Sequence, residues 1–107
     1  MNYVDFVAGN ESYKLRLNTR NIITLEKQIG GNPLSIFGAG DRVPPLGDMI
    51  AVLHASMQQY QHNITLAKAQ DIFDAYLEDG NTMVDFIPVI LEIYRASGII
   101  SAEKEKN

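Results

Sequence analysis

The two histidines, His54 and His62, are the first residues to consider for chemistry, because imidazole both binds metals and carries protons near neutral pH. They lie eight residues apart across an expected helix end. Neither a His-Glu-x-x-His motif nor a carboxylate at ligand spacing accompanies them. The pattern therefore does not indicate a metal site. We expect His54, at the border of an apolar helix face, to be half-buried and hydrogen-bonded.

Acidic residues gather in one later segment, at Asp71, Asp74, Glu78 and Asp79. Paired carboxylates catalyse acid–base reactions only where a cleft separates their pKa values. These four fall on the polar side of an expected amphipathic helix, which predicts a solvated face. The serines have no nucleophile motif around them, and the chain has no cysteine. We therefore expect no catalytic residue, no metal and no cofactor: the protein is predicted not to be an enzyme.

The glycine-rich segment "GGNPLSIFGAG" (30–40) resembles a phosphate-binding loop in composition alone. A Walker loop ends in Gly-Lys-Ser/Thr, and a dinucleotide-binding loop follows a strand and opens a helix. Neither context is present, so the glycines are read as the end of a helix followed by a loop.

Composition narrows the remaining classes. The chain has 107 residues, 46% of them hydrophobic and 21% charged, which predicts one globular domain over residues 1–100 and a flexible charged tail at 101–107. A net charge of −4 and scattered basic residues argue against nucleic-acid binding. No apolar run reaches the roughly 18 residues of a membrane helix, and "MNYVDFVAGNES" is no secretory signal. With the lack of cysteine, these features predict a cytoplasmic protein without membrane contacts.

The beginning of the chain predicts a β-hairpin. Residues 2–8 and 12–17 supply the strands, and the glycine and asparagine of "GNE" (9–11) suit a tight turn. In "SYKLRL", Tyr13 and Leu15 alternate with polar residues, so one face is expected to be buried. Because a lone hairpin is marginal in water, this one must pack on the rest of the chain.

Apolar residues recur at helical spacing in four later segments. Caps and glycines set their expected limits: Asn18 or Thr19 to Gly30, Leu46 to Tyr60, Asn63 or Thr65 to Gly80, and Thr82 or Asp85 to Gly98. A short helical turn is expected at "NPLSIF" (32–37) and a loop at 38–45. The second helix is expected to expose Ser56, and the third to turn Leu66 and Leu77 inward. The predicted fold is mainly α with an N-terminal hairpin (α+β), a small single-domain bundle of about four helices.

The segment "DFIPVILEIYRASGII" (85–100) is the most apolar of the chain. If Thr82 caps its helix, Asp85 completes a capping box and Pro88 bends the second turn. If Asp85 is the cap, which we favour, Pro88 lies in the first turn, where it is tolerated. Apolar residues fall on more than one side, because Val84, Val89 and Ile93 are read as pointing away from the stripe Phe86, Ile87, Ile90 and Tyr94. The helix is either surrounded by core or shared between core and a partner.

The order of these elements resembles a known family. The residues that carry the resemblance are "YKLRLNTRNIITLEKQIGGNPLSIF", the helix around "AVLHASMQQYQHNIT" and a last helix ending in "ASGII". Over about residues 11–100 the chain resembles the tail assembly chaperones of long-tailed phages and prophages of Gram-positive bacteria, the counterparts of the lambda G protein. The shared pattern is structural and contains no catalytic signature.

The resemblance implies a function and partners. Such chaperones bind the tape measure protein, a very long and largely helical chain, and keep it soluble in the host bacterial cytoplasm while the tail tube assembles. They carry no cofactor and are not expected in the mature virion. The family often makes a longer, frameshifted product that binds the tail tube protein. The ending "EKEKN" permits the adenine-rich codons of such a frameshift. We hypothesise that this chain is the short product, and a gene without an adenine run there would remove the basis for this.

The expected contact surface combines the apolar side chains of the last helix with methionines, which adapt to varied partners. Its residues are Phe86, Ile87, Val89, Ile90, Ile93, Tyr94, Met49, Met57 and Met83. The methionines serve equally well as ordinary core, and an apolar face without a client favours a homo-oligomer. Three alternatives remain open: a small regulatory protein that binds another folded protein, a virion structural component such as a head–tail connector, and a small hydrolase or metal enzyme.

Overall fold

The hairpin predicted at the start of the chain is present. A computed structural model describes residues 2–38 and 43–101, in which β1 (Val4–Ala8) pairs antiparallel with β2 (Glu11–Leu15). Gly9 and Asn10 make the two-residue turn with φ values of 60° and 70°. Positive φ at both turn positions matches the twist of the strands, which is why glycine and asparagine are suited to it.

Within the described residues, four α-helices and one short 3₁₀ helix follow, as the apolar periodicity predicts. They are α1 (Thr19–Ile29), η1 (Pro33–Phe37), α2 (Leu46–Met57), α3 (Leu66–Glu78) and α4 (Phe86–Ala96). The side-chain oxygens of Asn18, Asn32 and Thr65 each accept a hydrogen bond from a free backbone N–H in the first turn of α1, η1 and α3. The expected loop at 38–45 lies partly outside the described residues, as does the expected tail beyond Ser101.

The start of α4 combines the two readings that the sequence left open. The backbone N–H of Thr82 donates to Asp85 Oδ2 at 2.9 Å, and that of Asp85 donates to Thr82 Oγ1 at 3.2 Å. These two bonds form a capping box. Asp85 is also the N-cap residue of α4, as predicted, although its side chain makes no capping hydrogen bond to that helix. A tight turn separates the box from the α-helix, which begins at Phe86. Pro88 is consequently the third helical residue, where its missing N–H breaks no helical hydrogen bond.

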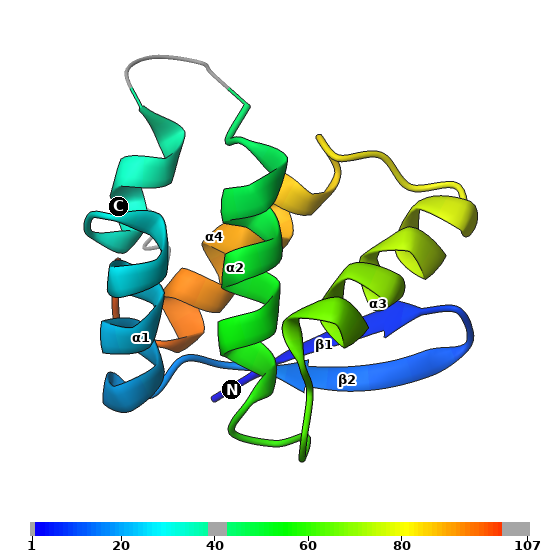
Figure 1. The fold of residues 1–107 in the computed structure, drawn as a ribbon, viewed down its shortest axis with the longest axis horizontal. Helices are drawn as coiled ribbons and strands as arrows, with labels where there is room; N and C mark the ends of the chain where they lie inside the picture. Colours follow the sequence, from blue (N-terminus) through cyan, green and yellow to red (C-terminus); the bar gives the residue numbers. More distant parts are fainter. Residues whose placement is uncertain (1, 39–42, 102–107) are drawn as a thin grey trace, which may run out of the picture.

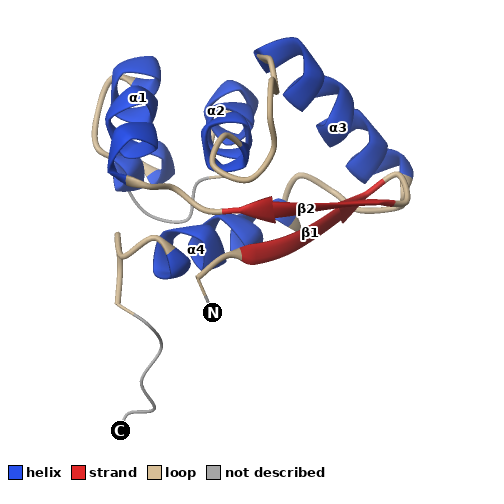
Figure 2. Cartoon of the chain, turned by 90° about the horizontal axis from the view of Figure 1, so that it is seen from below, coloured by secondary structure: helices blue, strands red, loops and turns tan. Residues whose placement is uncertain are grey.

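The helices and the hairpin form two layers. Helices α1, α2 and α3 lie in a row with α2 in the middle, and the hairpin and α4 cover the other side of that row (Figures 1 and 2). Helix α2 packs against α1, α3, α4 and β2. The domain is therefore a single compact α+β unit built around α2, and α4 is not its central helix.

The burial of α2 corrects one expectation about its faces. Ser56 is fully buried, although its polarity and position predicted a solvent-facing side. Its hydroxyl donates to the Leu53 carbonyl at 2.9 Å, and its own carbonyl accepts from the N–H of Arg16 in β2's continuation at 2.9 Å. The helix also ends at Met57, so Tyr60 is not part of it and stacks edge-on against Tyr3.

Aromatic rings join the two layers. Phe6 of β1, Phe73 and Tyr76 of α3 and Phe86 of α4 form a cluster in which the paired ring centroids lie 5.0–5.8 Å apart. Phe73 and Phe86 meet edge to face at 5.2 Å. Edge-to-face pairs gain energy beyond the burial of their area, so this cluster fixes where α4 and the hairpin dock.

Hydrogen bonds between distant parts of the chain close the domain. The N–H of Gly9 donates to Asp79 Oδ2 at 2.8 Å, and the N–H of Leu17 donates to Ser97 Oγ at 2.9 Å. The hydroxyl of Tyr94 donates to the buried carbonyl of Pro33 at 2.7 Å. These bonds join residues 70, 80 and 61 positions apart.

The bond from Tyr94 gives a prediction for stability. Tyr94→Phe is expected to lower the free energy of unfolding by about 1–2 kcal/mol, because the buried Pro33 carbonyl loses its donor. Burial, and to a smaller extent the carboxylate of Asp48, raises the pKa of the Tyr94 phenol. The folded state therefore holds this proton more tightly than the unfolded state. The contribution of the Tyr94 phenol to the free energy of unfolding is fully present below the ordinary tyrosine pKa of about 10 and decreases above it. Urea unfolding near pH 7 and above pH 10 should show a smaller alkaline loss in the variant, and equal losses would contradict the assignment.

Candidate partner-binding groove

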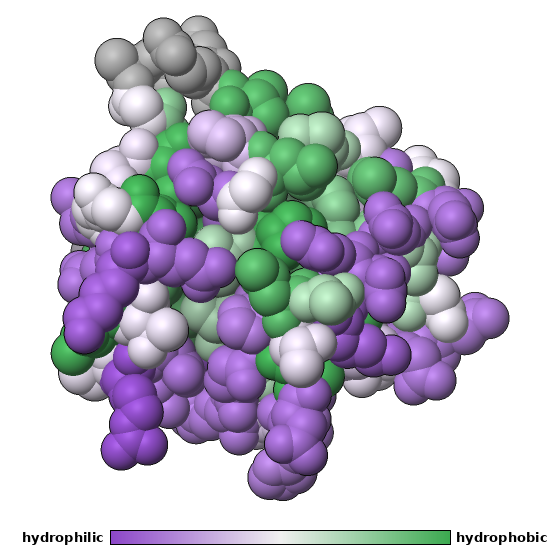
Figure 3. Space-filling model, viewed as in Figure 1, coloured by the Kyte–Doolittle hydropathy of each residue, from purple (hydrophilic) through white to green (hydrophobic). Residues whose placement is uncertain are grey.

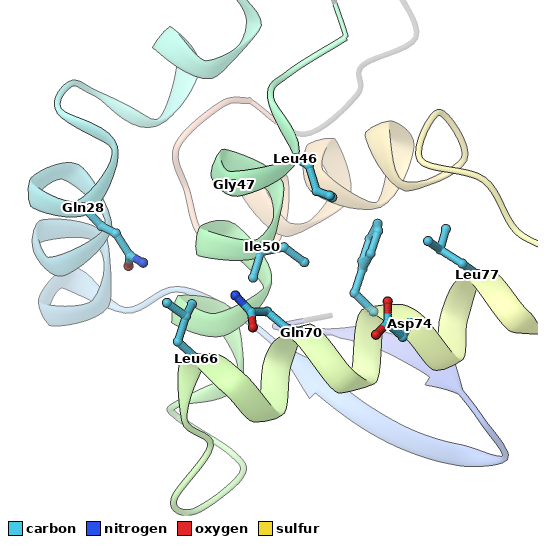
Figure 4. A pocket seen from close by; sticks show the side chains of 9 residues that line it. Gln28, Leu46, Gly47, Ile50, Leu66, Gln70, Asp74 and Leu77 are labelled. Carbon is cyan, nitrogen blue, oxygen red and sulfur yellow. The ribbon is translucent and has the colours of Figure 1, made fainter.

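An open groove lies between the helices of the α1–α2–α3 layer, on the side facing away from the hairpin (Figure 4). Its volume is about 320 Å³. Helix α1 contributes one side chain and α2 and α3 contribute the rest: Gln28, Leu46, Gly47, Ile50, Leu66, Gln70, Phe73, Asp74 and Leu77. We refer to these nine residues as the α2–α3 groove.

Some apolar side chains of the groove are exposed to solvent, unlike those of the core. Ile50 and Phe73 are buried and form its base, but Leu46 and Leu66 are 45% and 40% exposed. Both leucines are the first residue of their helix, where the neighbouring helix no longer covers them. Figure 3 shows apolar surface on this side of the molecule with polar side chains around it. The groove thus offers accessible apolar surface with a polar border.

Gly47 widens the groove on the side of α2. A Cβ atom built on this residue would meet no other atom within 4 Å, and its φ is not positive. Neither close packing nor backbone conformation therefore requires glycine there. The absent side chain leaves space beside Leu46 and Ile50 in Figure 4. Larger side chains at position 47 are compatible with the fold and reduce that space.

Most of the residues predicted to contact a partner lie in the core. Phe86, Ile90, Ile93, Tyr94, Met49 and Met57 are fully buried, so they contact no partner unless the domain opens. Met83 and Val89 are partly buried and pack against the core, and Ile87 is partly buried. The structure brings Phe86 into the aromatic cluster with Phe6 and Phe73, and it places none of the nine predicted residues in the α2–α3 groove.

The orientation assigned to Ile93 was wrong. Phe86 and Ile93 are seven residues apart, about two helical turns, and therefore lie on the same face of α4. Both are fully buried. Val84, which precedes α4, is 57% exposed, as its position off the stripe predicted. Helix α4 is therefore amphipathic, with one buried face.

The sequence contained a weak signal for the groove. Leu66 and Leu77 continue the apolar stripe of α3 and were expected to be inward, and Gly47 is an unusual residue near the start of a helix. Nothing in the periodicity distinguishes an apolar residue that packs in the core from one at the open end of an interhelical seam. The groove depends on how α1, α2 and α3 diverge, which is a property of the tertiary structure.

The histidines and carboxylates considered for chemistry are placed as expected. His54 Nε2 lies 2.9 Å from the carbonyl oxygen of Ile64, with the ring half-buried, and His62 is exposed. Asp71, Asp74 and Glu78 are exposed along α3. Within residues 2–38 and 43–101, no three histidine or acidic side chains are grouped so that they could hold a metal ion.

Fold and groove together define a small α+β domain with a two-layer arrangement and an apolar, polar-bordered groove between helices. The chain belongs to the family described as "Family of unknown function (DUF6096)", whose model matches residues 4–107. No curated protein and no solved structure shows a significant match to the chain. Among the described residues, no helix is both long and apolar enough to cross a membrane.

Proposed function

We propose that this protein is a tail assembly chaperone of a long-tailed phage or prophage, which binds the tape measure protein non-covalently and keeps it soluble during tail tube assembly. The α2–α3 groove supports binding of a helical client, because it combines exposed apolar side chains with a polar border. The resemblance over residues 11–100 supports the identity of the client. On this proposal the protein acts in the host bacterial cytoplasm, is not an enzyme, and is absent from the mature virion.

The shape of the groove suits an amphipathic helix. Such helices dock by inserting apolar residues spaced three to four positions apart into a groove between helices. Leu46 and Leu66 stand at the mouth of the groove, and Ile50 and Phe73 form its base. A tape measure protein presents many amphipathic turns, so one small groove recognises a general feature of that client. A longer frameshifted product that binds the tail tube protein, and a homo-oligomer, remain parts of the same proposal.

Co-expression tests the proposal. The protein is produced together with the long helical protein encoded beside it in its genome, and the soluble fraction is purified and sized. We expect a soluble complex that contains both chains, whereas the long protein alone should aggregate. A long protein that stays insoluble and unbound in the presence of this chain would reject the chaperone function.

Two leucine substitutions locate the contact surface. Gly47→Leu adds a side chain in the groove without removing any contact of the fold, and it is expected to reduce complex formation at least about tenfold. Ser12→Leu adds the same side chain to the exposed hairpin and is the matched control. Val84→Asp tests the neighbourhood of α4. Loss of the complex in Val84→Asp, with normal binding by Gly47→Leu, would move the contact surface from the groove to α4.

A further inference from the structure

The only ionisable side chain among the nine groove residues is Asp74. It is exposed, and it makes no hydrogen bond or ion pair with any other described residue. Figure 4 shows its carboxylate on α3, beside Gln70 and Leu77. A negative charge that no described residue pairs with therefore lies at the border of an apolar groove.

Helical geometry extends this charge along α3. Successive residues of a helix are turned by about 100° around its axis, so Asp74 lies about 40° from Gln70. Glu78 and Asp71 lie about 40° and about 60° beyond Asp74, in the same direction around the axis. All three carboxylates are exposed, and along the axis they span about 10 Å. Lys68, the basic residue of α3, is turned about 160° from Gln70. The solvent side of the groove along α3 is therefore acidic.

Among the described residues, those that line the opposite side of the groove are uncharged. Leu46 and Gly47 of α2 and Gln28 of α1 line that side. The described lining is accordingly asymmetric, with an apolar base, the Asp74 carboxylate on one long edge and the Gln28 amide on the other. Glu78 and Asp71 lie beyond Asp74 on the solvent side of α3. A symmetric ligand would gain nothing from this arrangement, whereas a helix with different flanks would bind in one direction.

We propose that the client helix carries lysine or arginine along one edge of its apolar stripe, and that Asp74, Glu78 and Asp71 pair with these basic residues and fix the direction of the helix. This inference deepens the proposed function and rests on it. Basic residues at positions i, i+3 or i+4 and i+7 of the client match the spacing of the three carboxylates. Exposed ion pairs add little affinity individually, but they select the partner and the orientation.

Two synthetic helices test the charge preference. Both are roughly 20 residues long, enough to form a helix, with the same leucine stripe and with either lysine or glutamate along one edge. Binding to the full chain is measured by fluorescence anisotropy between about 0.05 and 0.5 M salt. We expect the lysine helix to bind roughly fivefold to tenfold more tightly at low salt, and the difference to shrink as salt screens the charges.

A pair of double variants assigns the effect to the groove. Asp74→Asn with Glu78→Gln should abolish the preference for the lysine helix. Asp5→Asn with Glu11→Gln changes the net charge equally on the exposed hairpin and should preserve it. Equal binding of the two helices, failure of both to bind, or a preference that survives the groove double variant would overturn the inference.

The co-expression experiment separates this inference from the function. A soluble complex that is lost on substitution of Gly47 but unaffected by the changes at Asp74 and Glu78 would support the chaperone function. The same result would reject the proposal that the client carries basic residues along one edge. Absence of any complex would reject both. The size of the protein alone tests whether a second copy of the chain occupies the groove. A wild-type dimer that becomes a monomer on Gly47→Leu substitution would show that it does, and this result would also overturn the inference.

Discussion

Replacing Ile93 with aspartate is expected to leave the chain without a cooperative fold. Ile93 is fully buried on the core face of α4, so the new carboxylate would lose its water without gaining a partner. Burying an unpaired charge or protonating it in the core costs several kcal/mol, and the apolar contacts of isoleucine are lost as well. Since small domains have about 5–15 kcal/mol of stability in total, this change removes most of it. Circular dichroism during heating should show no sharp transition.

Ile23→Asp is the matched control for this experiment. Ile23 lies on α1 and is 49% exposed, so the same chemical change there should alter the free energy of unfolding by less than about 0.5 kcal/mol. A cooperative, near-wild-type melt of Ile93→Asp would mean that the side chain faces solvent. The reading of α4 as a helix with two apolar faces would then be restored.

Phe86→Ala is expected to cost about 3–5 kcal/mol of stability, the range for a large aromatic side chain removed from a packed core. The ring contacts Phe6, Phe73 and Tyr76, which come from the hairpin and from α3. Its removal therefore leaves a cavity where three elements meet, and none of them is free to move in and fill it. Urea unfolding measures the loss as a lower midpoint.

Val84→Ala, two residues earlier, is the control for Phe86→Ala. Val84 is exposed, and its truncation should change the midpoint little. Equal, small effects of both substitutions would contradict the packing of the aromatic cluster. A large effect at position 86 alone would show that α4 docks through this ring.

The parts of the fold that the sequence predicts are those determined by neighbouring residues. Gly9 and Asn10 form the turn because both adopt positive φ, and Asn18, Asn32 and Thr65 cap helices with their own side chains. Ser56 shows where local rules fail. Its polarity predicted a solvent-facing position, yet the side chain is fully buried and its hydroxyl donates to the Leu53 carbonyl.

The candidate site was harder to predict for a related reason. Apolar periodicity marks residues that leave water, but it does not tell which neighbour covers them. On α4 the stripe was assigned to a partner, and it packs on the aromatic cluster and on α2 instead. On α3 both Leu66 and Leu77 were expected to face inward and both border the groove, but only Leu77 packs against the core, whereas Leu66 is exposed. The acidic residues were correctly expected to be solvated, but their position beside that groove needed the arrangement of three helices.

The long-range hydrogen bonds have a consequence for the rate of folding. The contacts from Gly9 to Asp79 and from Leu17 to Ser97 join segments 70 and 80 residues apart, so docking of the hairpin requires the closure of loops of that length. Closing such long loops costs entropy before the contacts form, and high contact order slows two-state folding. In stopped-flow experiments this mainly helical domain should therefore fold at the pace of mixed α/β domains, well below that of simple helical bundles.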